Sequence, residues 1–474
     1  MENKHFQKLV DSGNPIGEVV AINRFLVTIR GLHPVNIRAL VMFEDGTKGL
    51  VHRILEDSVL ILNMGKSNPK IGTTCVVQHE SLVGKVGKDF LGRVVSATGE
   101  PLDGKGPIAA DGEWPVFNKA PGLQERTQLN TQLETGVTVI DSLFPLVKGQ
   151  RIAMIGDSRS GKSSLAQQIA THQVNTDVVV VYCMIAKRRS DINKLLDQLK
   201  KSGSMKNTIV VVSTMNESPV LGYLAPYVAC AMAEYLWQHE GKEVLLFFDD
   251  LTSHAYIYRE IALLSGTSPG RESYPGDMFY AHASLLERAG KLKKTEKTLT
   301  VIPLVLSPGG DITGYIPTNL MSISDGQWVL DLKIFNEGIK PAVNTGLSVT
   351  RVGGRGHNTL QKQHAAQIFK ALGAFAKAKE YSQFGSELAL ATRRDLELGK
   401  QIFSIMTQPS TETYSIITQQ LMLDVLLGSS VGENLDVSAL KMNAIKATPN
   451  IKKESDFKPV RDQVKQLSQL ELKR

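Results

Sequence analysis

The segment Gly156–Ser163, with the sequence GDSRSGKS, constrains the fold of this 474-residue chain more than any other stretch. It follows the apolar run Ile152–Ile155, and a helix-like pattern, SLAQQIATHQ, comes soon after it. A glycine-rich turn between a strand and a helix lets backbone N–H groups surround a polyphosphate, and the helix N-terminus adds positive potential. The segment therefore predicts a nucleotide-binding loop, in which Lys162 bridges the β and γ phosphates and the Ser163 hydroxyl ligates Mg²⁺.

All residues of this loop are candidate nucleotide contacts: Gly156, Asp157, Ser158, Arg159, Ser160, Gly161, Lys162 and Ser163. A second candidate metal ligand is Asp249, which ends the apolar run Val244–Phe248 and precedes Asp250. A carboxylate at the carboxyl end of a buried strand can hold Mg²⁺ directly or through a water molecule. A lone acid at a strand end is more often only solvated, but the loop upstream favours the metal role for Asp249.

The arrangement of patterns along the chain predicts three domains. Residues 1–82 contain short alternating runs typical of a small β-barrel. Residues 83–355 alternate apolar runs with helical patterns, which indicates a parallel α/β sheet. Residues 356–474 follow a helical period and predict a helical domain.

Composition excludes several classes of protein. The three cysteines, Cys75, Cys183 and Cys230, form no CxxC pair, which excludes a disulfide framework and a zinc ribbon. The longest apolar runs are far shorter than the roughly 20 residues of a membrane-spanning helix. The N-terminus shows no export or import signal. A net charge of +7 suits a polyphosphate, an acidic partner or a nucleic acid, and composition does not choose among them.

A series of ordered blocks gives the chain a more specific resemblance. The chain resembles the alpha chains of the F-type ATP synthase family over nearly its whole length. The blocks are LGRVV…GEPLDGKGP at 91–107, TGVTVIDSLFPLVKGQR at 135–151, the loop itself, YLAPYVACAMAEY at 223–235, FFDDL at 247–251, PGRESYPGDMFYAHASLLERA at 269–289, YIPTNLMSISDGQ at 315–327, GIKPAVNTGLSVTRVGG at 338–354 and SQFGSELALATR at 382–393.

This resemblance implies a six-stranded N-terminal barrel, a RecA-like P-loop nucleotide-binding domain and a C-terminal helical bundle. It implies ATP or ADP with Mg²⁺ as the bound ligand. It also implies an alternating alpha-3 beta-3 ring around a central gamma subunit, in a complex that couples ATP synthesis to a proton or sodium gradient. Such a subunit lies peripherally on the cytoplasmic face of the cell membrane, meets the membrane only through the ion-conducting sector, and binds no nucleic acid.

The same resemblance addresses catalysis at Lys187. Catalytic beta chains carry Gly-Glu-Arg-Thr after the equivalent strand, and that glutamate activates the attacking water. This chain has Ala186-Lys187-Arg188-Arg189 instead. A lysine is cationic near neutral pH and accepts no proton from water, so we expect this site to bind nucleotide and hardly turn it over. Whether Lys187 is an exposed basic residue or contacts phosphate stays open.

Two residues near the end of the α/β segment are candidate catalytic residues by resemblance. Arg351, in SVTRVG, matches the family's arginine that crosses the subunit interface to the γ-phosphate of the neighbouring beta site. A guanidinium suits the charge of the phosphoryl-transfer transition state. Taken alone, Arg351 would more readily be read as part of a surface ion pair. Ser348 matches a serine linked to activity, or it only shapes the turn that aims Arg351.

Two segments depart from the family pattern, so the family's functions at these segments are transferred to this chain only in part. The adenine-side segment reads MTQPSTETYS, and only Gln408 is a candidate there. The N-terminal HFQKLV is shorter than the helix with which alpha chains bind the delta subunit, so attachment to a peripheral stalk stays open.

Three other classes of protein share some of these features. A specialised F-type ATPase motor without the usual stalk would explain the short N-terminus. A Rho-like hexameric nucleic-acid translocase would suit the basic charge, but residues 17–82 offer only Phe25 and Phe43 as aromatic side chains for stacking bases. A homohexameric secretion ATPase would need a catalytic glutamate near Lys187, and the sequence has none there.

Overall fold

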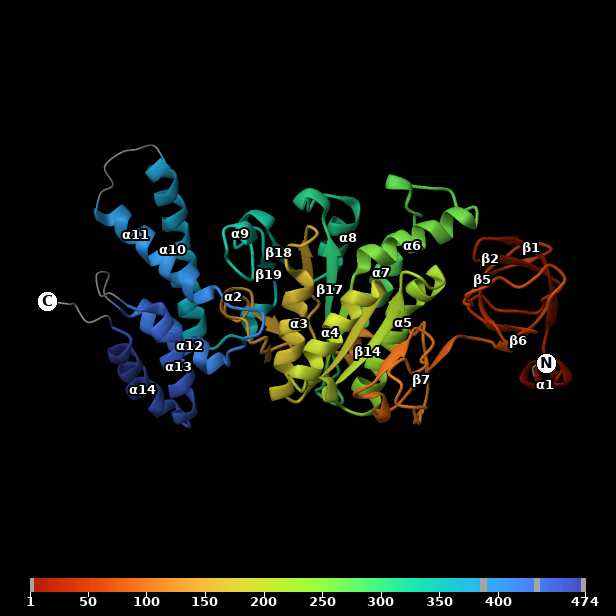
Figure 1. Cartoon of the computed structure of the whole chain (residues 1–474), viewed down its shortest axis with the longest axis horizontal. Coiled ribbons are helices and arrows are strands. Elements are labelled where there is room, and N and C mark those ends of the chain that lie inside the picture. The colour runs from red at the N-terminus through yellow and green to blue at the C-terminus, as the bar shows by residue number, and fades with distance from the viewer. Residues whose placement is uncertain (1–3, 384–389, 430–434, 470–474) are drawn as a thin grey trace. The chain divides into compact units, whose positions relative to one another are not determined.

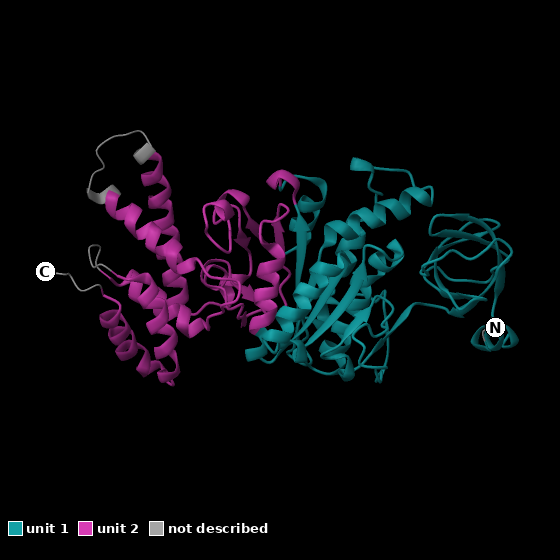
Figure 2. Ribbon diagram, in the orientation of Figure 1, with its two compact units in different colours: residues 1–128, 173–306, 312–324 teal, residues 129–172, 307–311, 325–474 magenta. Residues whose placement is uncertain are grey.

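The computed structural model describes residues 4–383, 390–429 and 435–469. Contacts divide the chain into two compact units (Figure 2). Unit 1 comprises Met1–Gln128, Gln173–Leu306 and Ile312–Ser324, and unit 2 comprises Leu129–His172, Ser307–Asp311 and Asp325–Arg474. The three predicted domain boundaries stay a prediction, because these units share the predicted α/β segment between them.

Unit 1 begins with the short helix α1 (Lys4–Asp11) and a closed antiparallel barrel (Figure 1). The barrel strands are β1 (Ile16–Asn23), β2 (Leu26–Arg30), β3 (Leu40–Phe43), β4 (Lys48–Ile54), β5 (Val59–Asn63) and β6 (Thr74–His79), closed in the order β1-β2-β5-β4-β3-β6. Apolar side chains such as Val27, Ile29 and Phe43 fill its interior. The expected six-stranded barrel is therefore confirmed.

The rest of unit 1 is built on a parallel sheet. Its strands, in spatial order, are β17 (Thr298–Leu306), β15 (Glu243–Asp249), β13 (Val178–Lys187), β14 (Thr208–Thr214) and β8 (Val94–Ser96). Its main helices are α4 (Arg189–Lys201), α5 (Pro219–Glu234), α6 (Leu251–Leu264), α7 (Met278–Leu286) and α8 (Tyr315–Ile323). The central strands are buried along most of their length, which explains their continuous apolar runs.

Unit 2 contains the strands around the predicted loop. β12 (Ala153–Gly156) pairs in parallel with β18 (Gly326–Leu330), and β19 (Val349–Thr350) pairs antiparallel with β18. A second short strand, β16 (Gly290–Lys291) of unit 1, runs antiparallel to β17. The expected parallel pairing holds for the main strands, and the two-residue antiparallel strands β16 and β19 make the sheet a mixed one.

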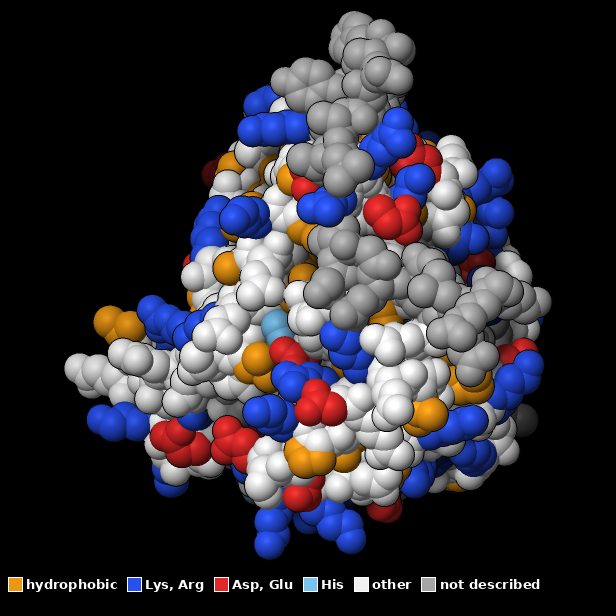
Figure 3. Space-filling view, turned by 90° about the vertical axis from the view of Figure 1, so that its left-hand side faces the viewer, with side chains coloured by type: hydrophobic (Ala, Val, Ile, Leu, Met, Phe, Trp, Pro, Cys, Tyr) orange, Lys and Arg blue, Asp and Glu red, His pale blue; other side chains and the backbone are white. Residues whose placement is uncertain are grey.

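Helices complete unit 2. The first three are α2 (Thr138–Leu143), α3 (Lys162–His172) and α9 (Leu332–Asn336), and the C-terminal ones are α10 (Thr359–Gln383), α11 (Leu390–Met406), α12 (Ile416–Leu427), α13 (Val437–Ala447) and α14 (Glu454–Leu467). Buried Ile402, Leu421 and Leu440 come from three different C-terminal helices, as a bundle requires. The expected helical region is confirmed. Lysine and arginine side chains on the visible face of these helices are spread among acidic and uncharged ones (Figure 3).

A buried ion pair joins two of the sequence blocks within unit 1. Glu234 closes α5 and Arg288 follows α7, and both side chains are almost completely buried. The guanidinium donates from Nε and Nη2 to the two carboxylate oxygens, each at 2.6 Å. Trp114 and Asn118 donate two further hydrogen bonds to the same carboxylate. Glu234 is thus a charge whose burial depends on Arg288.

Arg288→Met should destabilise the protein strongly, because it leaves the Glu234 carboxylate buried without its counter-ion, at a cost of about 3–5 kcal/mol. Thermal unfolding of the purified chain measures this effect. Arg24→Met is the matched control, since Arg24 pairs with Glu260 at an exposed surface and should contribute less than about 1 kcal/mol. Equal melting temperatures for the two variants would contradict the structural role of the buried pair.

Candidate nucleotide site and exposed arginine

The predicted loop lies between β12 and α3, as the sequence indicated. Gly156 has no room for a side chain, because a Cβ there would lie 2.6 Å from Ser160 Oγ and 2.8 Å from the Leu330 carbonyl. Arg159 and Gly161 both have positive φ angles, 63° and 95°. Left-handed residues in such a turn direct successive N–H groups toward one side, which forms an anion-binding concavity. The non-glycine Arg159 is strained in this conformation, as residues at functional sites often are.

Side chains of the loop also stabilise its shape. Lys162 Nζ donates to the carbonyl oxygens of Gly156 and Asp157, at 2.8 and 2.7 Å. The Asp157 carboxylate accepts from the backbone N–H groups of Ser158 and Gly309, at 2.6 and 3.0 Å. The Lys162 ammonium is therefore held against the start of the loop by two carbonyl oxygens. The Asp157 carboxylate ties the loop backbone at Ser158 to the backbone at Gly309.

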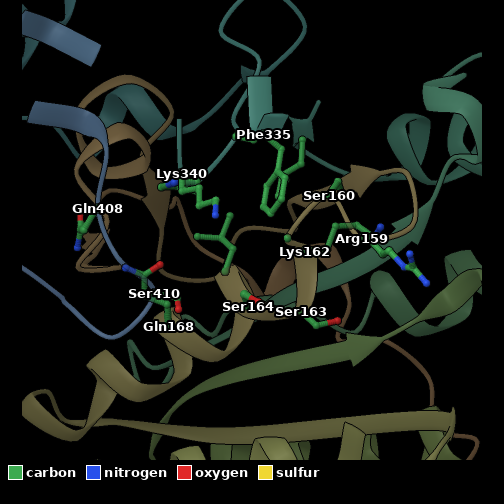
Figure 4. A pocket seen from close by; sticks show the side chains of 15 residues that line it. Arg159, Ser160, Lys162, Ser163, Ser164, Gln168, Phe335, Lys340, Gln408 and Ser410 are labelled. Atoms are coloured by element: carbon green, nitrogen blue, oxygen red, sulfur yellow. The ribbon is translucent and has the colours of Figure 1, made fainter. Parts of the chain in front are cut away.

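A cavity of about 350 Å³ lies against the loop and α3 (Figure 4). Its described lining includes three basic side chains, Arg159, Lys162 and Lys340, and no acidic one. The Lys340 ammonium lies 4.7 Å from the centre of the Phe335 ring. Phe335 reaches between Lys340 and the loop, whereas the Arg159 side chain extends away from the centre of the cavity. A cation-rich wall with one aromatic ring suits a polyphosphate that carries a flat base.

Part of this lining is predictable from the sequence and part is not. Phe335 belongs to no motif, so nothing in the sequence pointed to it, and Ser410 lies in the adenine-side segment where only Gln408 was a candidate. Gln408 does line the cavity, but its amide group forms hydrogen bonds with other residues of the chain. Its oxygen accepts from the N–H and hydroxyl of Thr138, and its nitrogen donates to the carbonyls of Gly136 and Glu412. The proposed contact between Gln408 and adenine stays a prediction, and the amide's visible role is to fix the wall.

Lys187 ends β13 in unit 1 and forms ion pairs with two carboxylates. Its Nζ lies 2.6 Å from Asp249 Oδ1 and 2.7 Å from Asp250 Oδ2. The Lys187 side chain is 18% exposed and that of Asp249 is 3% exposed. The Tyr182 hydroxyl donates to the other oxygen of Asp249 at 3.0 Å. The interpretation of Lys187 as an exposed basic residue is therefore wrong, because ion pairs with the two carboxylates hold its ammonium in a mostly buried position.

Charges around Lys187 fix its protonation. Burial by itself lowers the pKa of Lys187, but the charges and hydrogen bonds of Asp249 and Asp250 outweigh burial and raise it above its usual value. Burial likewise favours the neutral form of Asp250, yet the ammonium of Lys187 and a hydrogen bond from Ser253 hold the pKa of Asp250 below its usual value. Lys187 therefore stays cationic at neutral pH and has no lone pair with which to activate water.

Arg351 lies on an exposed part of unit 2 whose backbone is anchored on both sides. Its N–H donates to the Asp325 carbonyl at 3.0 Å. The buried Ser348 hydroxyl accepts from the Val329 N–H at 3.0 Å, and the Thr350 hydroxyl donates to the Pro145 carbonyl at 3.2 Å. Ser348 therefore holds the segment against β18, which favours its turn-shaping interpretation over direct participation in chemistry.

The predicted site residues fall into two groups. Residues 159–163 of the loop and Gln408 line one cavity of unit 2, whereas Gly156, Asp157 and Ser158 are not part of its lining. Arg351 and Ser348 belong to the same unit. Asp249, the second predicted magnesium ligand, belongs to unit 1. The part of the chain that the structure describes holds no group of three or more histidine, cysteine, aspartate or glutamate residues that could hold a metal ion.

Comparison with known proteins agrees with this architecture. Residues 136–350 match the ATP synthase alpha/beta family, nucleotide-binding domain, and residues 359–469 match the ATP synthase alpha/beta chain, C terminal domain. ATP synthase subunit alpha of Dictyoglomus turgidum is 38% identical over 434 residues, which cover 91% of this chain and 85% of that protein. The chain belongs to the ATP synthase alpha/beta family.

A second relative in this family is ATP synthase subunit alpha of Caldanaerobacter subterraneus subsp. tengcongensis. It is 37% identical over 442 residues, which cover 92% of this chain and 87% of that protein. Both relatives are thus named as alpha rather than beta subunits, in agreement with the resemblance seen in the sequence. Among the described residues, no helix has the length and apolar character needed to cross a membrane.

Lys162→Ala should lower the affinity for ATP by about 100-fold, because it removes a charge-assisted contact worth roughly 3 kcal/mol. Titration of the purified chain with ATP, followed calorimetrically, measures the change. Lys194→Ala, at an exposed position of α4, is the control and should bind as the unchanged chain does. Undiminished affinity of the Lys162→Ala chain would show that the loop is not the phosphate site.

Proposed function

We propose that this chain is the nucleotide-binding, non-catalytic alpha subunit of a proton- or sodium-translocating F-type ATP synthase. Such a complex makes ATP from ADP and phosphate at the expense of a transmembrane ion gradient. The observation that carries the non-catalytic role is the ion pairing of Lys187. The position at which catalytic chains carry a water-activating glutamate holds an ammonium bound to Asp249 and Asp250.

Nucleotide binding is proposed for the cavity of unit 2. The residues from Gly156 to Ser163 contact the phosphates of ATP or ADP, and Phe335 and Lys340 flank the remainder of the ligand. The basic lining supports this assignment, because a polyanion gains most from a wall without acidic side chains. Ser163 is the proposed contact for Mg²⁺ on the loop. Asp249 stays a proposed contact for Mg²⁺, directly or through a water molecule, and its carboxylate also pairs with Lys187.

The proposed assembly follows from membership of the family and from the alpha subunits that match the chain. This chain alternates with beta subunits in an alpha-3 beta-3 ring around a gamma subunit, on the cytoplasmic face of the cell membrane. A delta subunit and a peripheral stalk are further proposed partners, for which the chain offers the short α1 helix. The specialised motor without a stalk remains the alternative within the same family.

Arg351 is proposed to act at the nucleotide of a neighbouring beta subunit. Its exposed position allows the side chain to reach another chain, and the hydrogen bonds of Ser348, Thr350 and its own N–H fix the backbone from which it projects. A fixed backbone limits the conformational entropy lost when a guanidinium binds the spread charge of a phosphoryl-transfer transition state. Ser348 is proposed as a positioning residue for Arg351.

Arg351→Ala should lower steady-state ATP hydrolysis by the assembled complex by about 10³-fold, because the lost charge acts mostly on the transition state. Assembly and nucleotide affinity should stay nearly unchanged. Arg351→Lys should restore little activity, since an ammonium does not reproduce the planar, multi-donor contact. Turnover per intact complex and the amount of intact complex are measured on the same preparation.

The matched control for this test is Arg355→Ala, because Arg355 is an exposed arginine in the next turn of the same segment. It should leave turnover unchanged. A structural role for Arg351 would give the opposite pattern, with poor assembly or a lower melting temperature and normal turnover per intact complex. That pattern would remove the proposed role in the neighbouring site.

A further inference from the structure

A buried carboxylate in α2 of unit 2 accepts an unusual number of hydrogen bonds. Asp141 is 1% exposed and lies outside the lining of the nucleotide cavity. Its Oδ1 accepts the N–H and the hydroxyl of Thr135, at 3.0 and 2.8 Å. Its Oδ2 accepts the Gly136 N–H at 2.9 Å and the Gln419 side-chain amide at 2.8 Å. Asp141 therefore fixes the backbone at residues 135 and 136, because a donor released from a buried carboxylate would be left unsatisfied.

The turn that Asp141 fixes holds a second set of contacts. Gly136 has a φ angle of 74°, a conformation that favours glycine. Its carbonyl accepts from Gln408 Nε2 at 2.8 Å and from the Tyr414 N–H at 3.0 Å. The Gln419 amide that reaches Asp141 also donates to the Tyr414 carbonyl at 2.8 Å. Two routes, one through the Gly136 carbonyl and one through Gln419, thus join Asp141 to the chain near residues 408 and 414.

The segment 407–415, which connects α11 to α12, forms one wall of the cavity. Gln408 and Ser410 line the cavity from this segment, and both lie across the cavity from the predicted loop (Figure 4). The segment belongs to no helix or strand, so contacts with neighbouring elements set its position. Gln168 of α3 donates to two carbonyls in its middle, at 3.1 and 2.7 Å. The contacts that start from Asp141 hold the segment near both of its ends.

A wall that is fixed before a ligand arrives loses little conformational entropy when the ligand binds. We propose that Asp141 is a positioning residue for the nucleotide, which holds the 407–415 wall in place against the nucleoside part of ATP or ADP. The phosphates meet the loop on the other side of the cavity, so Asp141 affects the affinity for the nucleoside rather than for the phosphates. This inference rests on the proposed nucleotide-binding function and adds which residue prepares the nucleoside side of the site.

The test compares ATP with inorganic tripolyphosphate, which carries the phosphates without the nucleoside. Both are titrated calorimetrically into the full chain in the same magnesium buffer. Asp141→Asn places an amide donor where the carboxylate accepts N–H groups, so it should release the wall. It should weaken ATP binding at least about 10-fold and change the Kd of tripolyphosphate by less than about threefold. A merely structural role would move both values together.

A milder variant and a matched control accompany this measurement. Gln419→Met removes the bridge between Asp141 and Tyr414 at similar volume, and it should weaken ATP binding about fivefold without weakening tripolyphosphate binding. Asp424→Asn is the matched control, because Asp424 is a carboxylate of unit 2 that pairs with His364 and Arg461. It should leave both values of Kd unchanged.

A double variant tests whether Asp141 acts through the wall. Gln408→Ala removes the side chain by which the wall is held to Gly136 and Thr138. If Asp141 and Gln408 belong to one chain of contacts, their substitutions should not add. The chain with both Asp141→Asn and Gln408→Ala should then bind ATP about as weakly as the weaker of the two single variants.

Several results would overturn the inference and leave the proposed function standing. They are equal weakening of ATP and tripolyphosphate binding, ATP affinity of folded Asp141→Asn within about threefold of the unchanged chain, and additive effects in the double variant. Where Asp141→Asn fails to fold, Gln419→Met decides with the same two ligands. The absence of ATP binding by the unchanged chain contradicts the proposed function itself, and the inference falls with it.

Discussion

Parallel pairing of β13 with β15 sets Met184 opposite Asp249, so the carboxyl ends of the two strands meet at one edge of the sheet. Lys187 extends β13 just beyond this point, and its ammonium has two carboxylates within 2.7 Å. The pairing turns three charges that would each be costly to bury alone into a cluster with a net charge of about −1. The absence of a proton acceptor on Lys187 and the ion pairing of Asp249 both follow from this one contact.

Unit 2 separates two tasks that the proposed function requires. Its basic cavity, lined by Lys162 and Lys340, retains a polyanion, while Arg351 projects from a backbone segment tied to β18 and to Pro145. Under the proposed function the chemistry occurs in another subunit, which the exposed Arg351 would reach. This arrangement agrees with membership of the ATP synthase alpha/beta family.

Local patterns made the loop, the barrel and the helical region predictable from the sequence. Gly156 and Gly161 are required by backbone geometry, and the strand and helix around them are continuous in sequence. Contacts between distant residues were not predictable in this way. Lys187 and Asp250 are 63 positions apart, and only the sheet register brings them together. Phe335 belongs to a short helix without a motif, and the edge strand β19 is two residues long.

The central claim is that this chain holds nucleotide without turning it over. The most direct measurement titrates the isolated chain with ATP and follows phosphate release from the same sample. The account predicts saturable binding with phosphate release no faster than in a sample of Lys162→Ala chain. Phosphate release well above that background, dependent on Lys162, would contradict it, because Lys187 would then occupy a working catalytic site.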